Sequence, residues 1–288
     1  MSMIAEYGTL LKSRSNEEFF DLVLHRPLAY IIVKILQPTP VTANQVTFFS
    51  VLVCFAAAYC IAAPGMYFTA GMLMFAANIF DCVDGQLARL RGITSYYGRL
   101  ADGAGDYVSS IAFFTGIALW QPPYPMNPLL WCGIVIASMF AFARQSALVD
   151  YYRNEYSHRL AGKSNFARKE FEQAETELEN GVQNRANVFK LFALRFYYKY
   201  LSILQKSRPE TNAAGAVPSE VYVRENARLF RLWVLNGTVT PRFLLMFCCF
   251  LDRPDFFVWY LLSVSVIATT LLNMAQQQNN RRLAQRYA

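Results

Sequence analysis

Four aspartates within one short stretch are the residues of this chain best suited to chemistry. Asp81 and Asp84 are three residues apart, and Asp102 and Asp106 are four residues apart. On helices, each pair lies on one face with its members one turn apart. Two such helices that face each other would bring four carboxylates to one place. The stretch lies between apolar segments long enough to span a bilayer, where ionisable groups are costly and usually functional.

Four carboxylates in a low-dielectric site need positive charge beside them, because repulsion and lost hydration would otherwise protonate some of them. Carboxylate oxygens suit Mg²⁺ or Mn²⁺ rather than zinc, and Mg²⁺ usually shares its shell with substrate phosphates. Gly85 and Gly98 have no Cβ, so a ligand or a second backbone can approach them closely. Arg89 carries a planar donor fork that suits phosphate. Together these residues predict a divalent metal site for a diphosphate substrate.

The stretch from Asp81 to Asp106 resembles the signature of the CDP-alcohol phosphotransferase family, D-x2-D-G-x2-A-R-x8-G-x3-D-x3-D. All fixed positions and the gap between the two halves are present, at Asp81, Asp84, Gly85, Ala88, Arg89, Gly98, Asp102 and Asp106. The apolar pattern extends the resemblance over about residues 40–273. It leaves out the two tails and a charged insert.

This resemblance implies metal-dependent transfer of a substituted phosphate from a CDP-linked donor to an alcohol, with release of CMP. It implies two ions of Mg²⁺ or Mn²⁺, with Asp81, Asp84 and Asp102 as the main ligands. Asp106 is the candidate general base and a candidate ligand of the second ion. The remaining motif residues, Gly85, Ala88, Arg89 and Gly98, would hold the nucleotide and its phosphates. Family members are commonly dimers, so we expect a homodimer.

Two polar residues at the start of the first apolar segment extend the resemblance. The family often has Pro-Asn, an apolar residue and Thr at this entry; here Ala43 replaces the proline, whereas Asn44 and Thr47 are retained. The resemblance places both near the nucleotide. The alternative is that both simply cap the helix.

The substrate pair remains open between two branches of the family. One branch transfers a phosphatidyl group from CDP-diacylglycerol to a small polar alcohol, and we favour it for so compact a chain. The other uses CDP-choline or CDP-ethanolamine with diacylglycerol. Two rivals lie outside the family: a membrane prenyltransferase, whose D-x3-D pattern fits Asp102 and Asp106, and a cation transporter.

The composition indicates an all-α integral membrane protein. Apolar residues make up 55% of the chain and charged residues only 16%, against about 25% charged in soluble domains. We expect about six transmembrane helices, near residues 46–62, 66–90, 99–120, 129–149, 229–251 and 256–274. The predicted parts are 1–39 (N-terminal cytosolic or interfacial helix), 40–149 (helices 1–4), 150–228 (cytosolic helical insert), 229–275 (helices 5–6) and 276–288 (polar cytosolic tail).

The parts outside the motif carry weaker predictions. The N-terminal part is amphipathic and broken by Pro27, which fits a helix on the membrane surface or an ordinary packing helix. The sequence of the insert predicts a charged helix, a turn near Gly181 and an aromatic, basic helix. The insert would serve either packing and dimer contact or recognition of the membrane and the acceptor.

In the fifth span, Pro241 predicts a kink. Arg242 needs a partner there, either a substrate phosphate, a motif aspartate or a structural ion pair. Asn78, one turn before Asp81, either supports the site or packs between helices.

The charge distribution predicts topology rather than a nucleic-acid partner. The net charge is +7, yet the loops after spans 1 and 3 contain no Lys or Arg, and the loop after span 5 contains only Arg253. By the positive-inside rule, both termini, the insert and the Asp motif face the cytosol, and the excess charge fits anionic lipid. The six cysteines form no C-x2-C pair and are interpreted as packing residues. We expect no cleavable signal peptide.

Overall fold

The computed structural model is helical throughout the residues that it describes, with no strand among them. These are residues 18, 20–93, 96–162, 166–183 and 217–287, with positions 191, 194–195, 197–199 and 201–202 between them. The chain divides into two compact units, one of Met1–Ser146 with Leu235–Ile267 and one of Ala147–Val234 with Ala268–Ala288. All four aspartates lie in the first unit.

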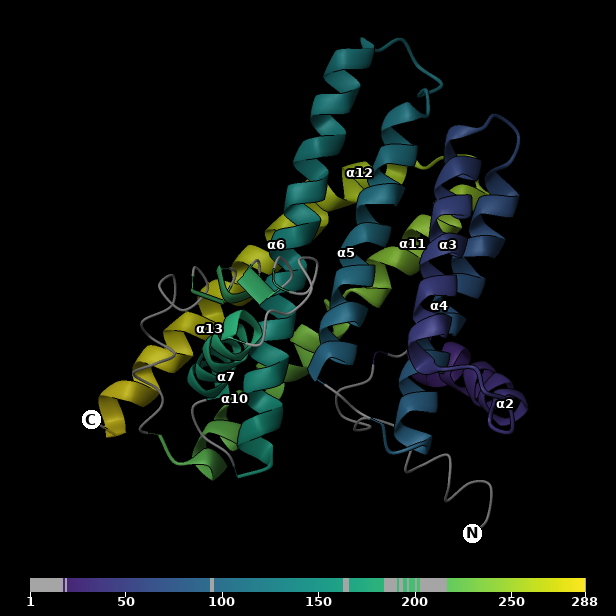
Figure 1. Ribbon diagram of the computed structural model, residues 1–288. Helices are drawn as coiled ribbons and strands as arrows, with labels where there is room; N and C mark the ends of the chain where they lie inside the picture. The colour runs from purple at the N-terminus through teal and green to yellow at the C-terminus, as the bar shows by residue number, and fades with distance from the viewer. Residues whose placement is uncertain are drawn as a thin grey trace. The chain divides into compact units, whose positions relative to one another are not determined.

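Three long helices form the centre of the first unit: α3 (Ala43–Ala62), α4 (Tyr67–Leu90) and α5 (Tyr96–Leu119) (Figure 1). α3 packs against both α4 and α5. It begins with a capping box in which Thr42 and Gln45 bond to each other's backbone N–H. The interpretation of Asn44 and Thr47 as caps is therefore wrong, because Thr42 is the cap. α5 also starts at Tyr96, three residues before the predicted start.

Small residues allow α3 and α5 to approach closely. A Cβ on Gly105 would lie 3.3 Å from Val51 Cγ2, and a Cβ on Gly116 would collide with the carbonyl oxygen of Ala58. Because Gly105 precedes Asp106, this contact sets how far the α5 carboxylates stand from α3 and α4.

The N-terminal part packs on α4 through a short π-helix, η1 (Asp21–His25), and α2 (Arg26–Leu36). Ala29 and Val33 of α2 are buried with Val83 and Leu87 of α4. Pro27 lies in the first turn of α2, where its missing N–H costs nothing, so it starts this helix rather than breaking it. α2 is thus a packing helix, and its place at the membrane surface stays a prediction.

The predicted fifth span is divided into α10 (Ser219–Leu235) and α11 (Val239–Phe250). Pro241 was expected to cause a kink, but the break lies earlier, over residues 236–238, because proline is accommodated in the first turn of α11. The Asn236 carbonyl at the break accepts a 2.8 Å hydrogen bond from Gln145, whose own carbonyl accepts one from Ser265. α11 packs on α4 and on α12 (Asp255–Tyr260), which continues through a second π-helix, η3 (Leu261–Ser265).

The core of the first unit is apolar. Trp131, at the start of α6 (Pro128–Leu160), is buried and donates its indole N–H to the Ile117 carbonyl at 3.0 Å. All six cysteines are free thiols, as predicted, and those in this core include Cys54 and Cys249. This packing holds α3, α4, α5 and α11 as one scaffold.

The second unit contains α7 (Phe166–Gln183), α10, most of α13 (Val266–Tyr287) and the end of α6. Its buried Arg159 bonds to Glu155 at 2.8 Å and to the Val217 carbonyl at 2.7 Å. The turn predicted near Gly181 is wrong, because α7 continues to Gln183. Half of the predicted aromatic, basic helix lies outside the described residues, and the described positions between 191 and 202 are helical.

Four helical runs among the described residues are long and apolar enough to cross a membrane: Ala43–Ala62, Pro128–Leu160, Ser219–Phe250 and Asp255–Tyr287. They support an integral membrane protein. The remaining two predicted spans correspond to α4 and α5, which carry the aspartates and do not meet the same criterion. The count of six therefore stays a prediction.

Candidate active site

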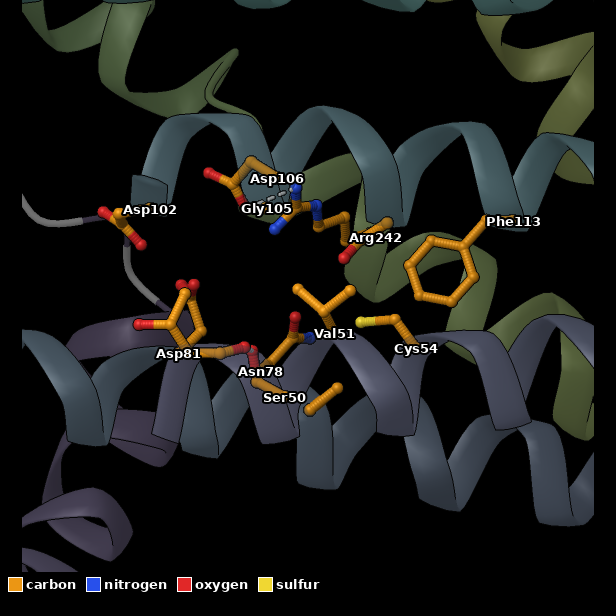
Figure 2. A pocket seen from close by; sticks show the side chains of 13 residues that line it. Ser50, Val51, Cys54, Asn78, Asp81, Asp102, Gly105, Asp106, Phe113 and Arg242 are labelled. Carbon is orange, nitrogen blue, oxygen red and sulfur yellow. Dashed lines mark hydrogen bonds and ion pairs between the residues drawn. The ribbon is translucent and has the colours of Figure 1, made fainter. Parts of the chain in front are cut away.

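Three of the four aspartates converge at one point of the first unit. One carboxylate oxygen from each of Asp81, Asp84 and Asp102 can be chosen so that all three lie within 4.8 Å of one another. Asp81 and Asp84 are one turn apart on α4, and Asp102 lies in the second turn of α5. Figure 2 shows Asp81 and Asp102 from these two helices facing the same space. The two helical spacings predicted four carboxylates at one place, and the structure brings three of them together.

The connection between the two helices is short, which keeps the two Asp pairs together. α4 ends at Leu90, and Gly92 follows with φ +67°, a backbone conformation that favours glycine at the end of a helix. Arg91 turns back to the end of α2, where its guanidinium donates to the carbonyls of Leu36 and Thr39 at 3.0 and 2.8 Å and also to that of Val41. Arg91 thus ties the segment before α3 to the end of α4.

Thr47 reaches the cluster directly from α3. Its hydroxyl lies 2.5 Å from Asp84 Oδ2, and Asp84 is only 5% exposed. A hydrogen bond from a hydroxyl to a buried carboxylate fixes the orientation of that carboxylate. Asn44, by contrast, is exposed in the first turn of α3. The structure therefore brings only one of the two residues predicted from this entry into contact with a motif aspartate.

Asp106 lies one turn beyond Asp102 and has a cation of its own. Arg242 of α11 donates from Nη2 to Asp106 Oδ1 at 2.8 Å (Figure 2). The Arg242 side chain is 16% exposed and that of Asp106 is 47% exposed. Of the partners considered for Arg242, the structure thus pairs it with a motif aspartate, across 136 residues of sequence. This pairing distinguishes Asp106 from the three converging carboxylates.

A pocket continues from the cluster between α3, α4, α5 and α11. Besides the aspartates it is lined by polar side chains, among them Ser50, Asn78 and Ser109, and by the apolar Cys54 and Phe113. Asn78 Nδ2 and Arg242 Nε are buried and have no hydrogen-bond partner within the described part of the chain. Buried donors are nearly always satisfied in proteins, so an oxygen-rich ligand fits this pocket. Ser50 and Ser109 were not predicted from the sequence. Each lies three residues after a candidate site residue, Thr47 and Asp106 respectively, so helical spacing could have identified both.

The remaining motif residues lie next to this cluster in the chain. A Cβ on Gly85 would lie 3.4 Å from both terminal nitrogens of Arg89, so Gly85 and the Arg89 guanidinium lie side by side on α4. Ala88 is half-buried near the end of α4, and Gly98 is half-buried in the first turn of α5. The donor set of the cluster is entirely carboxylate oxygen, which fits Mg²⁺ or Mn²⁺.

Comparison with known proteins agrees with this geometry. The sequence profile of the CDP-alcohol phosphatidyltransferase family matches residues 40–168. The chain is also 33% identical over 79 residues to a phosphatidylinositol phosphate synthase of Mycobacteroides abscessus. That alignment covers 27% of the chain and 36% of the relative, so the chain spans about a third of the relative's length. The residues that match the family profile, 40–168, hold all four aspartates.

Proposed function

We propose that the protein transfers a substituted phosphate group from a CDP-linked donor to an alcohol in phospholipid synthesis, with release of CMP. The observation that carries the proposal is the convergence of Asp81, Asp84 and Asp102 within the residues that match the family profile. The four apolar helical runs supply the membrane setting that a lipid substrate requires.

In this proposal the three converging carboxylates hold Mg²⁺ or Mn²⁺, with two ions expected. Bound cations would neutralise the donor diphosphate and the charge that develops on departing CMP. Thr47 keeps the Asp84 carboxylate turned toward the cluster. Arg89, with Gly85 beneath it, holds a phosphate of the donor, and Ala88 and Gly98 leave room for the nucleotide. Asn44 would lie near the nucleotide at the start of α3.

Asp106 is the proposed general base. It takes the proton from the acceptor hydroxyl, whose oxygen attacks the phosphorus of the substituted phosphate. The bond from that phosphorus to the bridging oxygen breaks, and the oxygen leaves with CMP. Arg242 lies 2.8 Å from Asp106 and holds its carboxylate in one orientation. Asp106 lies beside the cluster and its side chain is half exposed. Both features suit a base that must reach the hydroxyl of an incoming substrate.

We propose CDP-diacylglycerol as the donor and a small polar alcohol as the acceptor. The relative named a phosphatidylinositol phosphate synthase supports this branch of the family. The unpartnered donors at Asn78 and Arg242 also favour a polar, oxygen-rich acceptor over diacylglycerol. Choline or ethanolamine phosphotransfer to diacylglycerol is the alternative. A prenyltransferase would be inert toward CDP donors, and a cation transporter would move metal without forming CMP.

The setting of the reaction is proposed from the charge distribution. Both termini, the residues 150–228 and the Asp cluster would face the cytosol, where CDP-activated substrates are available. The protein would work in the lipid bilayer as a homodimer and would bind no nucleic acid.

The test is CMP release by the purified protein in lipid micelles with Mg²⁺ or Mn²⁺. CDP-diacylglycerol is offered with a panel of polar alcohols, and CDP-choline and CDP-ethanolamine are offered with diacylglycerol. The reaction is established, and the acceptor identified, if CMP release depends on the acceptor and falls about a hundredfold or more in Asp106→Asn. Donor binding measured by calorimetry should survive in Asp106→Asn. If the donor binds but neither panel gives CMP release, the proposed substrates are refuted.

A further inference from the structure

Two residues before α2, Glu18 and Phe20, contact the turn of α11 that carries Arg242. Glu18 contacts the beginning of that turn at Val239 and Thr240. Phe20 stacks on Phe243, the residue after Arg242, with ring centroids 4.0 Å apart and planes 18° apart. Two side chains of the N-terminal part thus hold the backbone on both sides of Arg242, more than 200 residues away in sequence.

Glu18 performs the capping that α11 does not provide for itself. Thr238, at the N-cap position of α11, makes no side-chain capping bond. Instead Oε2 of Glu18 accepts the backbone N–H of Val239 and of Thr240, both at 3.0 Å, and lies 3.4 Å from the Thr240 hydroxyl. Glu18 is only 3% exposed. A carboxylate at a helix N-terminus is favoured both by these unpaired N–H groups and by the helix dipole.

Gly237 gives Glu18 the space for this contact. A Cβ built on Gly237 would overlap the Glu18 carboxylate. The break between α10 and α11 therefore serves two purposes: it exposes the first N–H groups of α11, and it leaves an opening at Gly237 through which the carboxylate reaches them. An ordinary packing contact would not need a buried carboxylate at this point, because burying a charge is costly unless it is paired or well hydrogen-bonded.

We propose that Glu18 is a positioning residue of the active site, which fixes the first turn of α11 and so holds Arg242 against Asp106. The chain of contacts runs from Glu18 to Val239 and Thr240, along one turn to Arg242, and from Arg242 Nη2 to Asp106 Oδ1 at 2.8 Å. The inference rests on the proposed role of Asp106 as the base. It makes the N-terminal part a structural component of the site rather than only a membrane-surface segment.

Hydrogen–deuterium exchange tests the contact without using activity. Fragments that cover residues 236–243 are compared in the wild type and in Glu18→Ala and Gly237→Ala, in lipid micelles. Both variants should lose protection at about two amide hydrogens, those of Val239 and Thr240. Glu18→Gln should keep part of it, because its amide oxygen still accepts. Glu220→Gln, an exposed residue in the first turn of α10, is the matched control. Unchanged exchange in both Glu18→Ala and Gly237→Ala would overturn the capping contact.

A double-mutant cycle tests the connection to Arg242. Glu18→Ala and Gly237→Ala should each lower kcat about tenfold, the loss expected for one helix cap, with the KM for the CDP donor within about twofold of wild type. In the Arg242→Ala background, Glu18→Ala should slow turnover no further. An undiminished tenfold effect in that background would overturn the positioning role. Absence of turnover in the wild type would refute the proposed function instead, and the exchange measurement would still decide the contact.

Discussion

The hydrogen bond from Thr47 to Asp84 is the contact whose removal tests the metal site most directly. Thr47 Oγ1 lies 2.5 Å from Asp84 Oδ2 and 3.2 Å from the Ala43 carbonyl oxygen. One hydroxyl proton cannot serve both acceptors, and the shorter contact to a charged oxygen is the stronger. The hydroxyl therefore orients Asp84, and Thr47→Val removes that orientation while keeping the shape of the side chain.

The expected loss follows from the burial of Asp84, which is 5% exposed. A hydrogen bond to a charged group contributes about 1.5–3 kcal/mol, and residues that orient metal ligands commonly change metal affinity by about 10- to 100-fold. Thr47→Val should therefore raise the Mn²⁺ concentration for half-maximal CMP release by about tenfold or more. Thr47→Ser keeps the hydroxyl and should restore most of the affinity.

The assay follows Mn²⁺ in two ways, by CMP release and by the electron paramagnetic resonance signal of free Mn²⁺ during titration. Thr115→Val is the matched control, since Thr115 makes the same hydroxyl bond to a backbone carbonyl four residues earlier, at 2.8 Å, on an exposed face of α5. Equal Mn²⁺ dependence in Thr47→Val and Thr115→Val would show that the Thr47 hydroxyl does not orient a ligand.

Three further predictions concern the donor, the packing and the metal. Arg89→Ala should weaken binding of the CDP-linked donor about tenfold or more in calorimetry, whereas the exposed Arg224→Ala should not; equal affinities would exclude a phosphate contact. Gly116→Ala should lower the thermal unfolding midpoint, at a cost of about 1–3 kcal/mol, because its Cβ would meet the Ala58 carbonyl. Gly133→Ala, which meets nothing within 4 Å, should be neutral or stabilising. Mn²⁺ at about 100 times its Kd should stabilise the wild type by about 2.7 kcal/mol, and chelation or Asp84→Asn should remove that gain; stabilisation retained in Asp84→Asn would place the ion elsewhere.

The Asp cluster could be predicted from sequence because local periodicity decides it. Asp81 and Asp84 must share a face of any helix that contains them, and so must Asp102 and Asp106. A short connection then requires the two helices to be neighbours. Nothing beyond helix geometry and connection length was needed for these conclusions.

The contacts that local periodicity does not encode could not be found in this way. Glu18 and the start of α11 are separated by 221 residues, and no spacing rule connects them. A kink was predicted at Pro241, because proline is the residue in this span that interrupts helices. The break lies instead at residues 236–238, where hydrogen bonds among Gln145, Asn236 and Ser265 stabilise it. These three residues are far apart in the sequence, so no periodic pattern indicates that they interact. Gly181 was interpreted as a turn, yet it lies within α7, since tertiary packing overrides a single glycine's weak preference.

We propose that the pairing of Arg242 with Asp106 gives Asp102 and Asp106, one turn apart on α5, different roles. Four carboxylates around the same cations would compete for them, and a carboxylate bound tightly to metal is a poor base. In the proposed mechanism Arg242 would lessen that competition, because its Nη2 lies 2.8 Å from Asp106 Oδ1 and gives this carboxylate a positive charge from α11. The cations would then be held by Asp81, Asp84 and Asp102, while Asp106, whose side chain is 47% exposed, would accept the proton. On this proposal α11 contributes to the chemistry together with the motif, although it lies outside residues 40–168, which match the family profile.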